Sequence, residues 1–411
     1  MRYKKFNCLL ASAALLGAAA GCGSSKPAAG ASASKTITIG VLADLTGPAS
    51  ADDTTVPQGV RAGVGLAAKE GYHIKYVVVD TATSPSATLA GAQQLVDQDH
   101  AFAVVVISAL GFSAAPFLAS RGIPVVGAAI DSTEWITDRN MFSVLGTEDY
   151  TKVYSVYGKL FKMLGVTDLA SVGYSISPSS SETAQSTAIS AQRAGIRVGY
   201  LNASFPFGST NVGPLVLAMK SAGINAFYGS IEESTEFALI NDLRQEGVSL
   251  KVGLLATGYG GDLGVGGPGA TQAAQGLYFL TGFEPVEMHT AATERLQSNL
   301  KTYAGVTGDP TFAEYLGYLS VDALVQGLKA AGRNPTQASV INALQAIGNY
   351  NGAGLYGSHS VAFDTAGRGK VAGPDNCEWI TQYKGSSFRL IPGADPICGT
   401  TLPGLKVAPT S

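Results

Sequence analysis

Serine and carboxylate side chains are the groups in this sequence that could act on a substrate. Ser108 ends the β-branched run of the segment VVVISALGFSAAP, where a strand tip would present a nucleophile. A nucleophile elbow has glycine two residues before and after its serine, whereas this sequence has Val106 and Leu110 there. None of the four histidines follows a strand end as a base would. The pattern therefore disfavours a serine hydrolase.

Other catalytic patterns are equally weak. Glu232 and Glu233 are adjacent, so they diverge on a helix and indicate a solvated helix start rather than a paired-carboxylate site. No His/Cys spacing matches a metal site. The glycine-rich segment GYGGDLGVGGPG (258–269) lacks the Gly-Lys-Ser/Thr ending of a phosphate loop and predicts a flexible loop near a cleft mouth. We expect a protein that is not an enzyme and needs no metal or cofactor.

Hydroxyl, small and aromatic residues gather instead where predicted strands end. These segments are 43–50, 108–112 and 128–132 in the first half of the chain, and 174–175, 230–233 and 257–259 in the second. Such a lining suits an uncharged or weakly polar small molecule. At any one position the alternative is a helix cap or turn residue, because Ser and Asp serve well as both.

The elements that must position these residues alternate between strands and helices. Strands are predicted over 36–45, 74–82, 102–108 and 123–129, and helices over 56–69, 84–97, 150–164, 181–194, 215–222 and 234–246. The alternation predicts two sets of parallel strands covered by helices on both faces, joined near 142–149. Open sheets of this kind bind ligands at the carboxyl ends of their strands.

The last third of the chain has a different pattern. Helices are predicted over 290–304, 312–331 and 336–347. The segments SHSVAFDTAGRGK and CEWITQYKGSSFRLI then indicate short antiparallel strands with glycine turns.

Length and composition indicate two closely packed lobes. The chain has 411 residues, 46% of them hydrophobic and 14% charged, with 51 glycines. This length exceeds one typical core, and the low charge favours packed α/β layers. Loss of a signal peptide carrying Arg2, Lys4 and Lys5 changes the net charge from −3 to −6. An acidic chain without Lys/Arg clusters is not expected to bind nucleic acid.

The N-terminus has the profile of an export signal. A basic start and a short apolar stretch predict a signal peptide over residues 1–21. The sequence AAAGC, ending at Cys22, resembles the lipobox of bacterial lipoproteins, which implies acylation of that cysteine; plain secretion is the alternative. Residues 22–35 are a small, polar tether.

The late cysteine pair fits the same compartment. Cys8 leaves with the signal and Cys22 is assigned to the lipid, so Cys377 and Cys398 remain. An even pair in an exported chain predicts a disulfide. Closing this loop would stabilise the folded state by roughly 3 kcal/mol. Two free thiols are the alternative.

Four segments carry a family resemblance. TITIGVLADLTGP, GIPVVGAA, INAFYGS and LGYLSVDALVQGL resemble the branched-chain amino-acid-binding family of type I periplasmic binding proteins, the extracytoplasmic receptors of ABC importers. The resemblance implies two Rossmann-like lobes joined by three hinge crossovers that close on a ligand. It places the first lobe at 36–147 plus 283–348, the second at 148–282 plus 349–400, and a tail at 401–411.

The resemblance also implies site residues. Ser108 matches a serine that binds a ligand carboxylate, and Ala129 matches an alanine that offers backbone groups. Asp131 lies near a threonine of the same carboxylate site, so its charge would repel that ligand unless it turns away or caps a turn. Thr257 stands where the family has the acid that binds an amino group.

Taken together, these substitutions predict a small, weakly charged or partly apolar ligand, with a branched-chain amino acid as the other possibility. Tyr174 would cover an apolar part of the ligand, and Glu232 would accept from an amine, amide or hydroxyl. The candidate ligand-binding residues are Ser108, Ala109, Leu110, Ala129, Asp131, Ser132, Tyr174, Ile231, Glu232 and Thr257.

The function that follows is a solute-binding lipoprotein on the extracytoplasmic face of the cell membrane. It would deliver its small-molecule ligand to the permease subunits of an ABC transporter. The alternative is a sensory module that reports the ligand to a membrane partner. A transmembrane helix after the domain would favour sensing, and the C-terminal LPGLKVAPTS holds no apolar run.

Overall fold

The computed structural model describes residues 36–408 of the chain. The predicted signal peptide, the predicted lipidation site Cys22 and the predicted tether to residue 35 lie outside these residues. The first predicted strand is the first described element, β1 (Ile37–Ala43).

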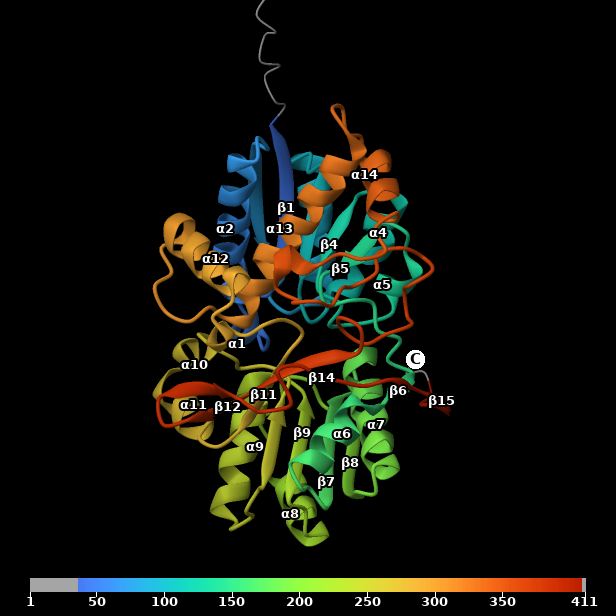
Figure 1. The fold of residues 1–411 in the computed structure, drawn as a ribbon. Coiled ribbons are helices and arrows are strands. Elements are labelled where there is room, and N and C mark those ends of the chain that lie inside the picture. The colour runs from blue at the N-terminus through green and yellow to red at the C-terminus, as the bar shows by residue number, and fades with distance from the viewer. Residues whose placement is uncertain (1–35, 409–411) are drawn as a thin grey trace, which may run out of the picture. The chain divides into compact units, whose positions relative to one another are not determined.

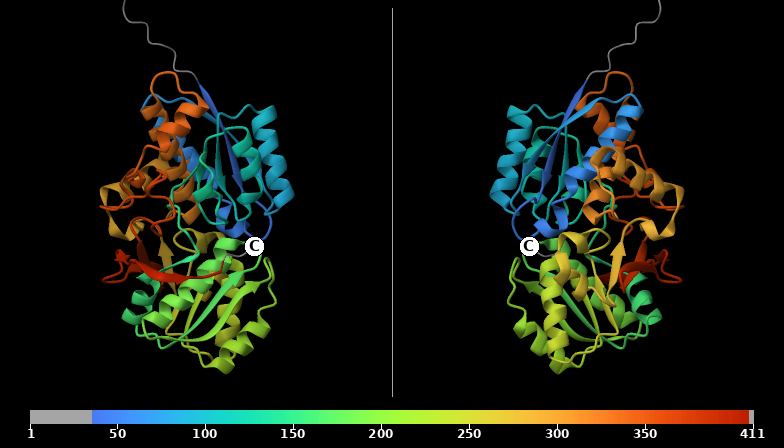
Figure 2. Two further views of the ribbon diagram at one scale, coloured as in Figure 1. Left: turned by 90° about the vertical axis from the view of Figure 1, so that its right-hand side faces the viewer. Right: turned by 90° about the vertical axis from the view of Figure 1, so that its left-hand side faces the viewer.

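The first lobe is built on a parallel sheet of order β2-β1-β3-β4-β5. Its other strands are β2 (Ile74–Asp80), β3 (Ala103–Ile107), β4 (Val125–Gly127) and β5 (Met141–Ser143). One face packs on α2 (Val56–Lys69) and α13 (Phe312–Ala331), and the other on α3 (Pro85–Gln93) and α4 (Ala115–Ser120) (Figures 1 and 2). Because both faces are covered, these strands are apolar on both sides.

The second lobe contains the larger sheet, of order β13-β12-β11-β10-β9-β7-β8. Its parallel strands are β7 (Asp168–Tyr174), β8 (Arg197–Phe205), β9 (Ala226–Ser230), β10 (Val252–Leu255) and β11 (Tyr278–Thr281). The antiparallel β12 (Cys377–Lys384) and β13 (Ser387–Leu390) complete it. Its helices are α6 (Ser155–Met163), α7 (Pro178–Arg193), α8 (Gly213–Ala222) and α9 (Glu233–Gln245). The predicted fold class, two parallel-sheet lobes flanked by helices, is confirmed.

Short elements connect and cover the two sheets. They are α1 (Ser50–Asp53), α5 (Glu134–Thr137), α10 (Asp262–Val265), α11 (Gly267–Ala273), α12 (Ala291–Asn299), α14 (Gln337–Leu344), β6 (Lys152–Tyr154), β14 (Ile397–Cys398) and β15 (Thr401–Lys406). Helix α1 of the first lobe contacts α9 and α10 of the second.

Glycines bring α13 against α2, although these helices lie far apart in the sequence. A Cβ atom on Gly59 would be 2.2 Å from the Glu314 carbonyl oxygen, and one on Gly317 would be 2.6 Å from that of Val56. Only glycine permits this approach of the two backbones. The small residues of the predicted 56–69 helix therefore hold a late segment of the chain in the first lobe.

Residues 350–368 pack on the first lobe, although we expected residues from 349 onward in the second. The Tyr350 hydroxyl donates to the Leu319 carbonyl at 3.0 Å, and the Arg368 guanidinium donates to the Asp138 carbonyl at 2.7 Å. The ring of Phe363 lies edge-on to that of Phe142. The last passage of the chain from the first lobe to the second therefore comes after Arg368.

Three local predictions were wrong. The predicted 150–164 helix begins only at α6, because β6 precedes it and pairs with β15 from the expected tail. The predicted 258–269 loop contains α10 and the start of α11. The segment SHSVAFDTAGRGK forms one isolated bridge between Val361 and Tyr350 instead of strands.

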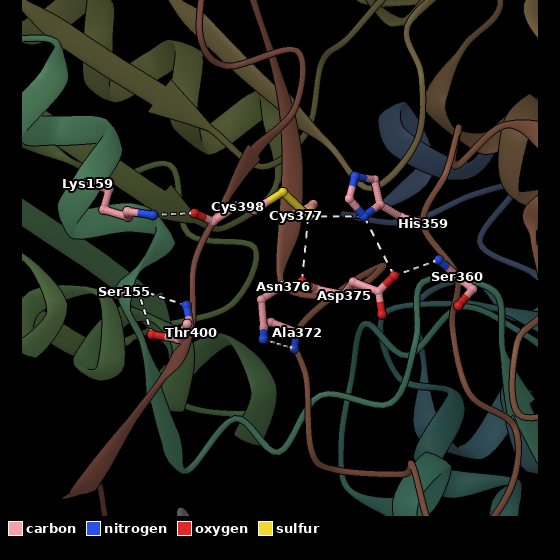
Figure 3. The surroundings of a disulfide bond; sticks show 10 residues. All are labelled: Ser155, Lys159, His359, Ser360, Ala372, Asp375, Asn376, Cys377, Cys398 and Thr400. Carbon is pink, nitrogen blue, oxygen red and sulfur yellow. Dashed lines mark hydrogen bonds and ion pairs between the residues drawn. A yellow bond between two sulfur atoms is a disulfide. The ribbon is translucent and has the colours of Figure 1, made fainter.

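The predicted disulfide between Cys377 and Cys398 is present and joins β12 to β14. Figure 3 shows it between two groups of contacts. On one side the Lys159 ammonium of α6 donates to the Cys398 carbonyl at 2.7 Å, and on the other His359 Nδ1 lies 3.5 Å from Cys377 Sγ. Because the two sulfurs are bonded to each other, this His/Cys group does not offer a thiolate metal site.

Candidate ligand-binding cleft

A cleft lies between the lobes where strands of both sheets end. Its empty volume is about 1240 Å³, part of it open to solvent, which is ample for a small metabolite. The first lobe contributes residues after β3 and β4 and from α1, and the second contributes the ends of β7, β9 and β10 with the start of α7. The first crossover contributes Leu145, Glu148 and Tyr150.

The structure places six of the ten candidate residues on the cleft wall, and the other four do not line it. The wall residues are Ala109, Ala129, Tyr174, Ile231, Glu232 and Thr257. The other four are Ser108, Leu110, Asp131 and Ser132, and Ser108, Leu110 and Asp131 are each 1% exposed. The predicted strand ends therefore lie at the cleft, but only some of their residues form its surface.

Asp44, which directly follows β1, occupies the hydrogen-bond donors at the end of β3. Its Oδ1 accepts from the Ser108 hydroxyl at 2.9 Å, and its Oδ2 accepts from the Ala109 backbone N–H at 2.8 Å. The Thr81 hydroxyl also donates to Oδ1. Asp44 is fully buried. The chain's own carboxylate thus takes the Ser108 hydroxyl, which the resemblance assigned to a ligand carboxylate, together with the neighbouring Ala109 N–H.

The donors after β4 are also engaged within the chain. The Ala129 N–H donates to the Ser143 hydroxyl at 2.9 Å, and its carbonyl accepts from the Tyr150 hydroxyl. Asp131 is turned away from the cleft, where it accepts from the Phe112 N–H and, at 2.9 Å, from Trp135 Nε1. The turned-away orientation was one of the possibilities for this aspartate.

Tyr174 is held firmly at the end of β7. Its hydroxyl donates to the Thr235 hydroxyl at 2.9 Å and accepts from the Glu232 N–H at 3.2 Å. Its ring packs edge-on to Phe207, with the ring centroids 4.9 Å apart. Tyr150, Tyr157, Tyr228 and Phe312 extend this aromatic lining.

Hydrogen bonds cross between the lobes at the edges of the cleft. The Ser177 hydroxyl and the Ser179 N–H, at the start of α7, donate to the Asp131 carbonyl at 3.1 and 3.2 Å. Elsewhere the Glu233 N–H donates to Asp52 Oδ2 at 3.4 Å. The lobes are therefore in contact across the cleft.

The charge of the cleft wall is wholly acidic among the described residues. Its titratable acids are Asp52, Asp53, Glu148, Glu232 and Glu378, and no Lys, Arg or His of the described chain lines it. Burial raises the pKa of Glu148 to about 8 and that of Glu232 well above its usual value, and the Asp52 charge adds to the second effect. A weakly polar lining, as the sequence predicted, is therefore only part of the wall.

Glu233 contradicts its predicted role as a solvated helix start. It is 1% exposed, and neither carboxyl oxygen has a hydrogen-bond partner among the described residues. Burial, with the nearby Asp52 charge, raises the pKa of Glu233 to about 9. The prediction was wrong because α1 of the first lobe covers the start of α9.

Comparison with known proteins identifies the family. A family model described as periplasmic binding protein matches residues 36–386. The chain belongs to the periplasmic binding protein family. The resemblance inferred from the sequence is thus confirmed. Among curated protein sequences, none matches the chain.

Solved periplasmic binding proteins share the fold at low sequence identity. The leucine-binding protein LivK of Thermotoga maritima is 18% identical, with a TM-score of 0.71 over 86% of this chain and 97% of that one. LivJ of Streptococcus pneumoniae, solved with isoleucine, is 17% identical, with a TM-score of 0.69 over 91% and 100%. A solute-binding protein of R. palustris, solved with 4-hydroxybenzoate, is 15% identical, with a TM-score of 0.70 over 87% and 96%.

As a member of the periplasmic binding protein family, the chain is a binding protein and not an enzyme. Its family places it outside the cytoplasm. Within residues 36–408, no helix combines the length and the apolar character needed to cross a membrane.

Proposed function

We propose that this protein captures a small molecule between its lobes by hinge closure and delivers it to the permease subunits of an ABC importer. The cleft carries this proposal, because both lobes and a crossover contribute its wall. A ligand that contacts both walls favours the closed arrangement by its difference in affinity for the two states. A few hydrogen bonds and apolar contacts in a closed cleft suffice for micromolar affinity, about −8 kcal/mol.

The ligand differs from those named for the solved relatives. Leucine, isoleucine and 4-hydroxybenzoate each carry a carboxylate. Here Ser108 and Ala109 already donate to Asp44, and the Ala129 N–H donates to Ser143. A ligand carboxylate would find these donors occupied and would face the acidic cleft wall. We therefore favour a ligand recognised without a carboxylate at the strand ends of the first lobe.

A thermal-unfolding screen of the mature chain tests capture. The compounds are amino acids, amides, aromatic acids, amines and short polar metabolites. A ligand of the native state at one hundred times its Kd adds about 2.7 kcal/mol of stability, so the Tm rises. Tyr174→Ala should abolish the rise, and Tyr174→Phe, which keeps the ring, should retain part of it.

Tyr200→Ala is the matched control, because Tyr200 lies in β8 and does not line the cleft. It should leave the ligand response intact. The proposal fails if no compound raises the Tm, or if Tyr174→Ala responds like the unaltered protein.

We further propose that Cys22 carries a lipid that anchors the protein to the membrane, as the sequence AAAGC suggests. Cell fractionation tests this. The unaltered protein should sediment with membranes, and Cys22→Ala should move to the soluble fraction. Cys8→Ala, which lies in the predicted signal, is the control and should stay with membranes. An unchanged distribution of Cys22→Ala would contradict the anchor.

A further inference from the structure

One pair of acids faces the cleft from opposite lobes. Asp52 comes from α1 of the first lobe, and Glu232 precedes α9 of the second. Asp52 is 9% exposed, and its buried Oδ1 has no donor within 3.5 Å among the described residues. Its carboxyl group interacts with the carboxyl group of Glu232 through a shared proton, which a cation would replace. The negative charges of Asp52, Asp53 and Asp44 all raise the pKa of Glu232. No described Lys, Arg or His forms an ion pair with Asp52 or Glu232.

A second pair of acids lines another part of the same cleft. Glu148 belongs to the first crossover, and Glu378 belongs to β12. Glu378 is 7% exposed, and its buried Oε2 also lacks a hydrogen-bond partner among the described residues. Burial raises the pKa of Glu378, the Glu148 charge adds to this effect, and both side chains line the cleft.

Aromatic rings accompany the second pair. Tyr157 and Tyr228 line the cleft, and their ring centroids are 5.4 Å apart. Burial raises the pKa of Tyr157 and of Tyr228, and the charges of Glu378 and Glu148 add to the rise in both. The faces of aromatic rings attract an ammonium group, and the attraction is larger when the group is desolvated.

In the ligand-free protein these buried carboxyl groups hold their protons, and a cation bound beside them would favour their charged form. A buried ion is costly unless a charge of opposite sign and hydrogen bonds accompany it. The described chain supplies no basic side chain at this wall, whereas an ammonium group offers both the charge and several donors. Two pairs of acids in one cleft would hold two such groups.

Resting on the proposed function of the cleft, we propose that the ligand is an aliphatic diamine or polyamine. One ammonium group lies between Asp52 and Glu232 of the two lobes, and a second binds Glu148 and Glu378 beside the rings of Tyr157 and Tyr228. The methylene chain between them lies along the apolar part of the wall, which includes Ile231 and Leu280. The ligand thereby supplies the positive charge that the wall lacks.

Isothermal titration of the mature chain tests the inference with putrescine, cadaverine and spermidine. Butylamine, leucine, benzoate and calcium chloride are the comparison probes. At least one diamine or polyamine should bind with a Kd in the micromolar range, and butylamine should bind about tenfold more weakly or worse, a loss of about 1.4 kcal/mol. Leucine and benzoate should give no measurable heat of binding.

Charge-removing variants locate the two groups. Glu378→Gln keeps the side-chain shape and should weaken diamine binding about tenfold, because one of the two ammonium sites loses its charge. Asp52→Asn should also weaken diamine binding about tenfold, because it removes a charge from the other ammonium site. Glu294→Gln, at an exposed position of α12 outside the cleft, should leave the affinity unchanged. Thermal unfolding of each variant shows whether it folds.

The outcomes separate this inference from the proposed function. Binding of a neutral or acidic compound without any diamine overturns the inference and leaves solute capture standing. Calcium binding that depends on Glu378 or Asp52, without diamine binding, also overturns it. Diamine binding that Glu378→Gln and Asp52→Asn both leave unchanged overturns the assigned positions. If nothing binds in the cleft, both proposals fail.

Discussion

The free energy of unfolding of the ligand-free protein should fall as the pH rises from 5 to 8. Burial raises the pKa of Glu148 from 4.5 to about 8 and that of Glu233 from 4.5 to about 9. Between the ordinary and the raised values, the folded state keeps protons that the unfolded chain has released. Stability is therefore lost with rising pH across this window, from about 4.5 up to about 8 or 9.

The expected loss is large because several acids contribute in the same direction. Burial raises the pKa of Asp53, Glu236 and Asp262 as well, and neighbouring negative charges add to each effect. Each carboxyl that stays protonated costs about 1.4 kcal/mol per pH unit in this window. The contribution of Glu148 is smaller, because water partly reaches it.

Denaturant unfolding at pH 5, 6, 7 and 8 measures this loss. Glu233→Gln removes a titrating group whose oxygens have no partners, so it should flatten the decline and stabilise the protein at pH 8. Glu294→Gln, exposed on α12, should reproduce the slope of the unaltered protein. A free energy of unfolding that rises between pH 5 and 8 would contradict the acidic cluster as described.

Asp44→Ala should lower the free energy of unfolding by about 2–4 kcal/mol, because it leaves several buried donors without an acceptor. The Ser108 and Thr81 hydroxyls and the Ala109 N–H all donate to this carboxylate. Each unsatisfied buried donor costs about 1–3 kcal/mol, and water entering the space left by the side chain recovers part of it.

Asp97→Ala is the matched control for this change. Asp97 forms an exposed ion pair with Arg121 at 3.1 Å, and exposed pairs contribute about 1 kcal/mol or less. Urea unfolding of the three proteins at one pH gives the comparison. Equal stabilities of Asp44→Ala and Asp97→Ala would show that the Asp44 hydrogen bonds do not support the fold.

The sequence was most informative where local patterns and the fold agree. The predicted 312–331 helix has the observed bounds, because Thr311 and Glu314 form a capping box at its start and the following residues are almost continuously buried. The 150–164 helix was mispredicted because β6 depends on β15, which lies at the far end of the chain. Pairing between remote segments has no local pattern.

The sequence predicted the cleft residues at the ends of parallel strands, and it missed those on other elements. Tyr174 ends a parallel strand, Glu232 and Thr257 follow others, and the cleft lies where those strands end. Asp52 was missed because it lies in a four-residue helix without periodicity. Glu378 was missed because β12 joins the sheet only after the last crossover.

Asp44 illustrates a further limit. It was part of a predicted strand end, but its partner Ser108 lies 64 residues later in the chain. Whether a buried carboxylate faces a ligand or its own backbone depends on packing between such remote segments. A single sequence specifies the residue types at a strand end, and only the fold decides which of them reach the cleft.

On the proposed function, the position of Asp44 would also disfavour solutes that bind through a carboxylate at the strand ends of the first lobe. A well-oriented group within one molecule can reach an effective concentration on the order of 10⁵ M. A dissolved carboxylic acid at millimolar concentration competes poorly with such a group for Ser108 and Ala109. The protein would therefore remain available for its own solute in a medium rich in free amino acids. On this proposal, the carboxylate of Asp44 acts as an intramolecular competitor of carboxylate-bearing nutrients for these two donors.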